Sequence, residues 1–183
     1  MTVDIKLELS KHSKVMLQEL AEAGKNVDVA HKRAGISAQR KMKAEANRQV
    51  RKTRIIKHDK LSKLIIAYVR GGGMGTEFFV RVNGEPIPVA KLPHRQNRKG
   101  VRFKVRRDKS SMMRGAFVAK MKSGNVGVFK REGDGRLPIK QVFTSGISSA
   151  FKDEGPRLIV VQAGEREYLK TLVRNFFTKR KRK

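Results

Sequence analysis

Histidines and acidic residues are the side chains in this sequence that could carry acid–base or metal chemistry, and both are sparse. The four histidines show neither an i,i+4 pair nor a neighbouring cysteine; they are His12, His31, His58 and His94. A zinc site needs several converging ligands, such as two histidines and a carboxylate. The scattered positions therefore favour solvated histidines over a metal site.

The acidic residues of the middle of the chain are equally poor candidates for hydrolysis. Each of them lies among cationic residues: Glu85, Asp108, Glu132 and Asp134. A metal-dependent nuclease needs two or three carboxylates around one ion, and no serine stands in a G-x-S-x-G motif. The glycine run at residues 71–75 lacks the Lys-Ser/Thr pair of a P-loop, so it predicts a flexible connection between strands. We therefore expect no enzyme, no cofactor and no metal.

The net charge is the strongest signal in the sequence. The 183 residues include 44 Lys and Arg against 16 Asp and Glu, which gives a formal net charge of +28 at pH 7. A body with that excess repels itself and favours an anionic partner, of which nucleic acid is the first to expect. No stretch approaches eighteen apolar residues, so we expect no membrane partner, and the absence of cysteine excludes disulfides.

Two stretches concentrate the positive charge. Residues 91–114 hold ten Lys or Arg with the single acid Asp108, and residues 32–63 hold twelve with Glu45 and Asp59. The chain has no Trp and two Tyr, so few side chains are suited to base stacking, and contact with a nucleic-acid backbone is favoured over base readout. An acidic partner protein is the alternative for these cations. The candidate contacts are Arg95, Arg98, Lys99, Arg102, Lys104, Arg106 and Arg107.

Helices are expected in the first third of the chain. Ser10 is suited to cap a short helix that ends near Gly24. A long helix over residues 27–54 then carries small residues at every fourth position, among them Ala30, Ala34, Ala38 and Met42. Such a ridge lets another backbone approach closely. We predict that it contacts a neighbouring subunit.

After residue 54 the hydrophobic period becomes that of strands. Strands are expected over residues 61–70 and 76–84, and Pro86 and Pro88 then restrict the chain to an edge strand or an extended segment. Apolar and cationic residues alternate over residues 101–106, which predicts a strand with one apolar and one cationic face.

Residues 115–143 predict a hairpin with a tight turn at residues 123–125. The residues expected to pack inward are Phe117, Val118, Val128 and Phe129. Strict alternation puts neighbouring residues on opposite faces, so a bulge at Gly127 would be needed to reconcile the second strand. Pro138 lacks a backbone donor, so residues 137–143 should lie at a sheet edge, free to dock on an adjoining subunit. This docking corner comprises Phe129, Arg131, Arg136, Leu137 and Pro138.

The sequence DEGP at residues 153–156 predicts the start of a last helix, with acids at the positive end of its dipole. The fold class is therefore α+β, with long N-terminal helices, a small and mostly antiparallel sheet with a hairpin, and a C-terminal amphipathic helix. We expect a helical arm over residues 1–25, a single domain over 26–178 and a basic tail over 179–183.

Three segments in this order resemble the minor tail protein Z family of lambda-like tailed bacteriophages, also called tail completion proteins. They are the small-residue helix at 27–54, VNGEPIPVAKL at 82–92, and the stretch from GAFVAKMKSGNVGVFKREG to RLPIKQVFTSGISSAF at 115–151. The most specific positions are those of GAF, GVFKR and LPI within the last stretch.

The resemblance implies a structural protein of the virion, assembled in the host cytoplasm, at the head-proximal end of the tail. It implies a ring of this chain, of six copies, next to tail terminator or tail tube proteins and the head connector, where double-stranded genomic DNA passes. It implies no catalytic residues. From the residues alone, a ribosomal or other sequence-independent RNA-binding protein stays an alternative. A closed ring would favour the first function and a monomer scaffolded by RNA the second.

Overall fold

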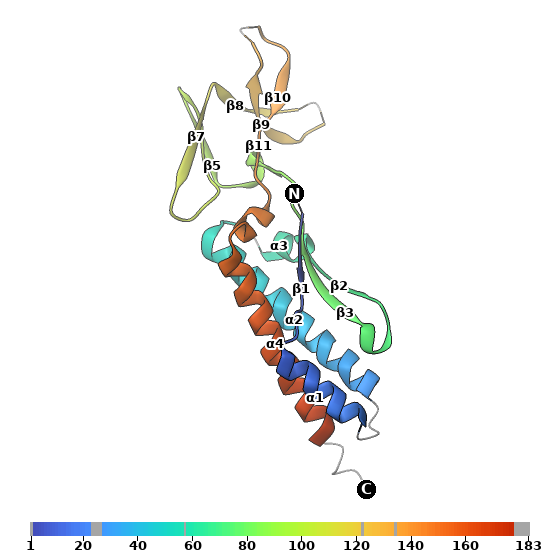
Figure 1. The fold of residues 1–183 in the computed structure, drawn as a ribbon. Coiled ribbons are helices and arrows are strands. Elements are labelled where there is room, and N and C mark those ends of the chain that lie inside the picture. The colour runs from blue at the N-terminus through green and yellow to red at the C-terminus, as the bar shows by residue number, and fades with distance from the viewer. Residues whose placement is uncertain (1, 23–26, 57, 122, 134, 178–183) are drawn as a thin grey trace.

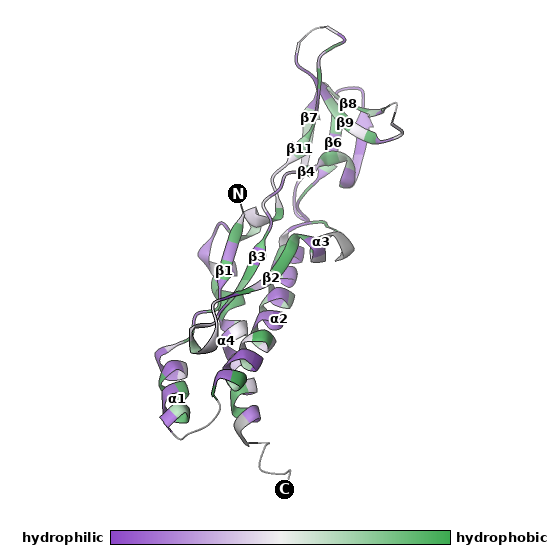
Figure 2. Ribbon diagram, turned by 90° about the vertical axis from the view of Figure 1, so that its right-hand side faces the viewer, coloured by the Kyte–Doolittle hydropathy of each residue, from purple (hydrophilic) through white to green (hydrophobic). Residues whose placement is uncertain are grey.

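The chain folds into two parts, a helical body and a β-stranded head that projects from one end of it (Figure 1). The structure is a computed structural model that describes residues 2–22, 27–56, 58–121, 123–133 and 135–177. Each part has its own cluster of buried apolar side chains. Figure 2 shows the same elongated arrangement after a quarter turn. The expected α+β fold class is confirmed.

The helices of the described residues belong to the body. They are α1 (Lys11–Glu22), α2 (Val27–Thr53), α3 (His58–Leu64) and α4 (Glu154–Phe177). Short 3-10 turns lie at Gly73–Gly75, Val89–Lys91 and Ile147–Phe151, and the one at Val89–Lys91 belongs to the head. The Ser13 amide donates to Ser10 Oγ at 3.3 Å, which confirms Ser10 as the N-cap of α1. Helix α4 begins where the acids and Pro156 predicted. Gly24 and the basic tail 179–183 lie outside the described residues.

Helix α3 corrects the strand predicted over residues 61–70. The strand β2 begins at Ile65 and ends at Arg70, and the preceding turn is helical. Leu61 is fully buried and Leu64, three residues later, packs against the same cluster, which is the spacing of one helix face. The apolar run therefore contains a helical period followed by a strand period.

The small-residue ridge of α2 packs against the chain's own α4. Ala34, Ala38 and Met42 have no exposed surface, and Ala30 is 6% exposed. On the facing helix, a Cβ added at Gly164 would stand 2.5 Å from the Cγ of Met42, so both helices use small residues for a close approach. The prediction of a subunit interface at Ala30, Ala34, Ala38 and Met42 is therefore wrong, because these side chains have no surface left to offer.

The other side of α2 is covered by a three-stranded antiparallel sheet with the order β1-β3-β2. Strand β1 (Val3–Lys6) pairs with β3 (Glu77–Val82), so the segment predicted as a helical arm contributes a strand before α1. Phe78 of β3 lies directly on Gly35, where an added Cβ would stand 1.9 Å from the ring. Gly35, which costs helix propensity, thus makes room for a core aromatic.

The head consists of short strands in three small sheets. The strands are β4 (Ile87–Pro88), β5 (His94–Asn97), β6 (Gly100–Lys104), β7 (Ser110–Arg114), β8 (Ala116–Lys120), β9 (Val126–Arg131), β10 (Ile139–Gln141) and β11 (Phe143–Thr144). Their orders are β5-β6-β7, β10-β9-β8 and β11-β4. A small apolar cluster that includes Val89, Val101, Val128 and Val142 lies between them. The extended segment expected at Pro86 and Pro88 is present as β4.

The predicted hairpin is the β8–β9 pair, and its register is regular. Ala116 pairs with Lys130 and Lys120 with Val126, without an interruption at Gly127, so the predicted bulge is wrong. The two faces are covered in different ways. Val128 packs into the head core, while Phe129 folds over Gly127 on the opposite face and lies 6.3 Å from the Phe117 ring. Both faces of β9 are therefore buried without a bulge.

Arg54 joins the end of α2 to the segment that leads from the head into α4. Its guanidinium donates to the Ser145 carbonyl at 3.0 Å and to the hydroxyl of Ser149. Burial of the side chain, together with the charge of Arg106, lowers the pKa of Arg54 from its ordinary value. The backbone of residue 54 also forms a bridge with Arg106, so body and head are held together at this end of α2.

Candidate nucleic-acid interface

The outer face of the β5-β6-β7 sheet is cationic. Arg95 pairs with Arg102, and both side chains point to the same side as Lys104 and Arg114, because paired and alternate residues of antiparallel strands share a face. The opposite face carries Val101 and other residues that belong to the head core. The alternation predicted over residues 101–106 is confirmed for this strand, and Arg114 joins the set that the sequence indicated.

The tight turn between β5 and β6 extends this surface. Asn97 Oδ1 accepts a hydrogen bond from the Lys99 amide at 3.1 Å, and the Lys99 carbonyl accepts one from the Gly115 amide at 3.1 Å. These bonds fix the turn that carries Arg98 and Lys99, both exposed. Gly100 follows with a φ of +146°, and a Cβ there would stand 2.1 Å from the Met113 carbonyl oxygen. Only glycine allows β7 to approach this closely.

Arg106 and Arg107 lie at the joint with the body instead of on the sheet face. The Arg107 amide donates to the Thr53 carbonyl at 3.2 Å, and Arg107 Nε donates to the Arg51 carbonyl at 2.8 Å. These bonds bring Arg107 to a shallow, open depression at the end of α2. It is lined by Ala44, Asn47, Arg48, Arg51, Lys52 and Arg107.

The structure therefore joins two basic stretches that are separate in the sequence. We call the combined surface the basic surface; it comprises Arg48, Arg51, Lys52, Arg95, Arg98, Lys99, Arg102, Lys104, Arg106, Arg107 and Arg114. The seven cations predicted as contacts are all exposed. The sequence indicated the stretch at residues 32–63 as basic but not that it meets the other stretch, since this depends on pairing between residues 53–55 and 105–107, and no local pattern indicates that pairing.

Few acids offset this charge. Among the described residues, the ion pairs within the basic surface are Arg106 with Asp108, at 3.4 Å, and Arg48 with Glu45, at 3.5 Å. Exposed pairs of this kind contribute little, so most of the cations stay available to an anionic ligand. No aromatic side chain lies on the cationic face of the sheet, because Phe103 points into the head core. The surface suits contact with phosphates and not base stacking.

The predicted docking corner is divided between two environments. Phe129 is 7% exposed and supports the sheet from within. Arg136, Leu137 and Pro138 are exposed in the connection from β9 to β10, and the Arg131 guanidinium lies 5.3 Å from the centre of the Phe117 ring. The corner can thus offer a partner its loop and Arg131, but not Phe129. Asp134 lies outside the described residues.

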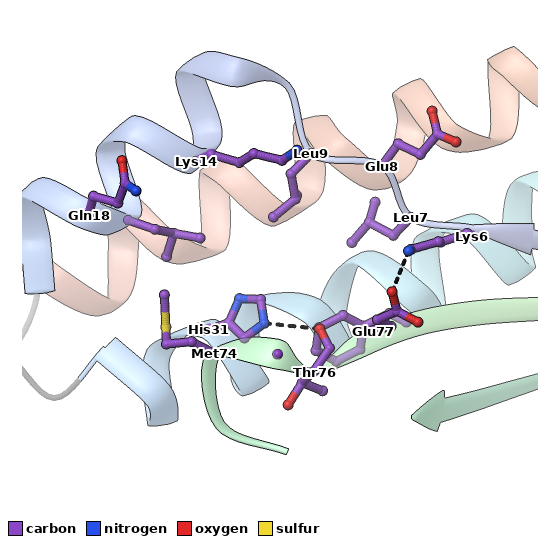
Figure 3. A pocket seen from close by; sticks show the side chains of 13 residues that line it. Lys6, Leu7, Glu8, Leu9, Lys14, Gln18, His31, Met74, Thr76 and Glu77 are labelled. Carbon is purple, nitrogen blue, oxygen red and sulfur yellow. Dashed lines mark hydrogen bonds and ion pairs between the residues drawn. The ribbon is translucent and has the colours of Figure 1, made fainter. Parts of the chain in front are cut away.

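A pocket of about 590 Å³ in the body holds a buried histidine (Figure 3). His31 Nε2 donates to the Thr76 carbonyl at 3.2 Å, and in the neutral ring Nδ1 accepts from the Tyr168 hydroxyl at 2.6 Å. Burial raises the pKa of Tyr168, which keeps that hydroxyl protonated. Both ring nitrogens are therefore engaged in packing the body. Across the described residues, no group of three His, Cys, Asp or Glu side chains is placed to hold a metal ion.

Comparison of the chain with family models, curated proteins and solved structures gives no match. Within the described part of the chain, no helix is both long and apolar enough to cross a membrane.

Proposed function

We propose that this protein is a structural component of a tailed-phage virion, which completes the head-proximal end of the tail and contacts the DNA that passes there. The observation that carries the proposal is the basic surface, in which Arg107, in the segment that follows β6, lies beside the cations of α2. The resemblance of residues 27–151 to the minor tail protein Z family supplies the biological setting. The work of the protein is binding and joining, without a catalytic step.

Contact with DNA is electrostatic in this proposal. Lys and Arg side chains that neutralise phosphates release condensed counterions, so binding falls steeply as salt rises. The lack of an aromatic platform on the cationic face favours sequence-independent contact. Such contact suits a protein through which any part of a genome must pass.

The protein acts as a ring in this proposal, since a closed ring is how identical subunits surround a tube. The interface of that ring lies elsewhere than on the α2 ridge, which α4 fills. Head surfaces are the better candidates, because Leu137 lies there, which at 72% is the most exposed large apolar side chain of the described residues. Neighbours in the assembled tail are terminator or tube proteins and the head connector.

Native mass spectrometry of the full chain, with and without a 30-base-pair DNA duplex, tests the proposal. We expect a closed oligomer of fixed copy number that takes up duplex DNA of any sequence. A strict monomer that binds an RNA duplex about tenfold more tightly than the DNA duplex of equal length and salt would instead support an RNA-binding protein. The RNA-binding function rests on the same basic surface, so the copy number is the deciding observation.

A further inference from the structure

The face of the β10-β9-β8 sheet that points away from the head core carries two phenylalanine rings packed on each other, and Phe129 is 7% exposed there. Phe117 of β8 pairs with Phe129 of β9, which pairs with Gln141 of β10, so the three side chains share one face. Ile139 lies on the same face of β10, and Phe143, 50% exposed, follows two residues after Gln141. Phe143 and the partly buried Ile139 are the apolar side chains of this region that an added segment can still cover.

The same sheet has an open edge at β10. The Val142 amide donates to the Val128 carbonyl, and the Glu132 amide donates to the Pro138 carbonyl. Since hydrogen-bonded pairs alternate along an antiparallel ladder, the backbone groups of Lys140 face β9 and those of Ile139 and Gln141 face outward. No described residue bonds these outward groups.

The opposite edge of the sheet is protected. There, the outward amide of Val118 in β8 donates to the side-chain Oε1 of Gln96 at 2.8 Å. Sheet proteins block edges in such ways to prevent pairing with other chains. One edge is thus capped by a side chain from β5. The β10 edge is left open over Ile139–Gln141, up to the point where the Val89 amide donates to the Val142 carbonyl and β4 pairs with Phe143.

Charge decides what can occupy this edge. The cations Arg131, Arg136 and Lys130 are exposed around it, and the nearby acid Glu132 is engaged by Lys140. A second copy of the chain would bring the same cations to this edge, and two chains that each carry a formal net charge of +28 repel each other. Nucleic acid would meet the cations and the aromatic rings but would leave the strand-like row of outward N–H and C=O groups unmatched.

We propose that β10 accepts an extended segment of a different protein, with alternating apolar and acidic side chains, as an added strand of the sheet. On one face of the added strand, the apolar side chains of the segment cover Ile139 and Phe143, while its backbone pairs with Ile139 and Gln141. Its acids lie on the other face, where they meet Lys130 and Lys140, a pair across β9 and β10. The inference is independent of the proposed function, since it uses neither the basic surface nor DNA.

The probe is a fluorescent eight-residue peptide of alternating Glu and Val, titrated with the full chain and followed by anisotropy. A block peptide of four Glu followed by four Val, and an alternating Lys and Val peptide, control for composition and charge. We expect the alternating acidic peptide to bind at least about tenfold more tightly than either control. Methylation of those backbone nitrogens of the peptide that face β10 should abolish binding, and it leaves the protein itself unchanged.

The matched protein variants are Gln141→Pro and Gln141→Thr. Proline removes the outward amide of residue 141 and no bond to β9, whereas threonine keeps that amide. We expect Gln141→Pro to lose at least about tenfold in peptide affinity and Gln141→Thr to keep it, with duplex-DNA binding unchanged in both.

Several results would overturn the proposal. Two of them concern the peptides: the alternating acidic peptide does not bind, or the block or N-methylated peptide binds equally well. The other two are that this chain forms a dimer which Gln141→Pro disrupts, and that a single-stranded oligonucleotide competes with the peptide for the site. The last two results would assign the edge to a second copy or to nucleic acid. If the unmodified chain does not bind duplex DNA, the result counts against the proposed function and leaves the peptide result unaffected.

Discussion

The body and the head differ in how far the chain covers its own packing surfaces. In the body, the ridge of α2 is filled by α4 and its other side by Phe78 and the β1-β3-β2 sheet, so the chain uses its own elements for every close-packing face of this helix. In the head, the β5-β6-β7 sheet presents cations outward and the β10-β9-β8 sheet has an open edge at β10. The difference supports our proposals, in which the body is a support and partners meet the head.

The first prediction compares a core phenylalanine of the body with an exposed one of the head. Phe78→Ala should lower the free energy of unfolding by about 3–5 kcal/mol, because Phe78 is 2% exposed and lies on Gly35. Phe143→Ala should cost less than about 1 kcal/mol, because half of that side chain is already in water. Urea denaturation measures both, and equal losses would mean that the head surface is part of a core.

A second prediction tests whether the α2 ridge is internal. Ala38→Phe should overpack the contact with α4 and cost about 1–3 kcal/mol in stability, while the exposed Ala44→Phe on the same helix should be nearly neutral. Thermal unfolding monitored by circular dichroism separates the two. A stable Ala38→Phe variant with altered oligomeric mass would restore the ridge as an interface between subunits.

The third and smallest effect concerns pH and the attachment of α1 to α4. Hydrogen bonds from Ser10, joined by Ser13, lower the pKa of Glu165 below its ordinary 4.5. Because folding favours the carboxylate, this contribution is present above the ordinary pKa and is lost as the pH falls through the lowered value. Glu165→Gln should therefore lose less stability than the parent chain between about pH 5 and pH 3.

Asp4 supplies the control for that measurement. A hydrogen bond from Arg81 lowers its pKa as well, so part of the acid sensitivity should persist in Glu165→Gln. Identical pH profiles for the parent and the variant would show that the hydrogen bonds of Glu165 do not stabilise the carboxylate.

Local signals in the sequence predicted much of the fold. Ser10 at a helix start, the acids before Pro156, and the turn at residues 123–125 act within a few residues, so each placed its element well. The strand expected from residue 61 begins at Ile65, because Leu61 and Leu64, separated by Ser62 and Lys63, follow the helical period of α3.

Long-range pairing accounts for what the sequence could not predict. A ridge of small residues indicates close packing but not the identity of the packing partner, and the partner α4 lies more than a hundred residues later. The cationic alternation of residues 101–106 predicted the exposed face of β6. The contact between Arg107 and Arg51, which enlarges the basic surface, follows only from the folded chain.

The salt dependence of duplex-DNA binding tests the central claim most directly, namely that the basic surface of the head and its joint contact phosphates. A labelled 30-base-pair duplex is titrated with three full-length proteins between about 50 and 200 mM salt. They are the parent, the triple variant Arg95→Gln, Arg102→Gln, Arg107→Gln, and the control Lys32→Gln, Arg33→Gln, Arg40→Gln, whose exposed cations lie in the first half of α2.

We expect a steep parent slope of log K against log salt, a slope shallower by about 3 for the triple variant, and a control slope close to the parent's. Equal reductions in both variants would show that net charge alone binds DNA. A shallow parent slope, or a strong preference among duplex sequences, would contradict contact through phosphates.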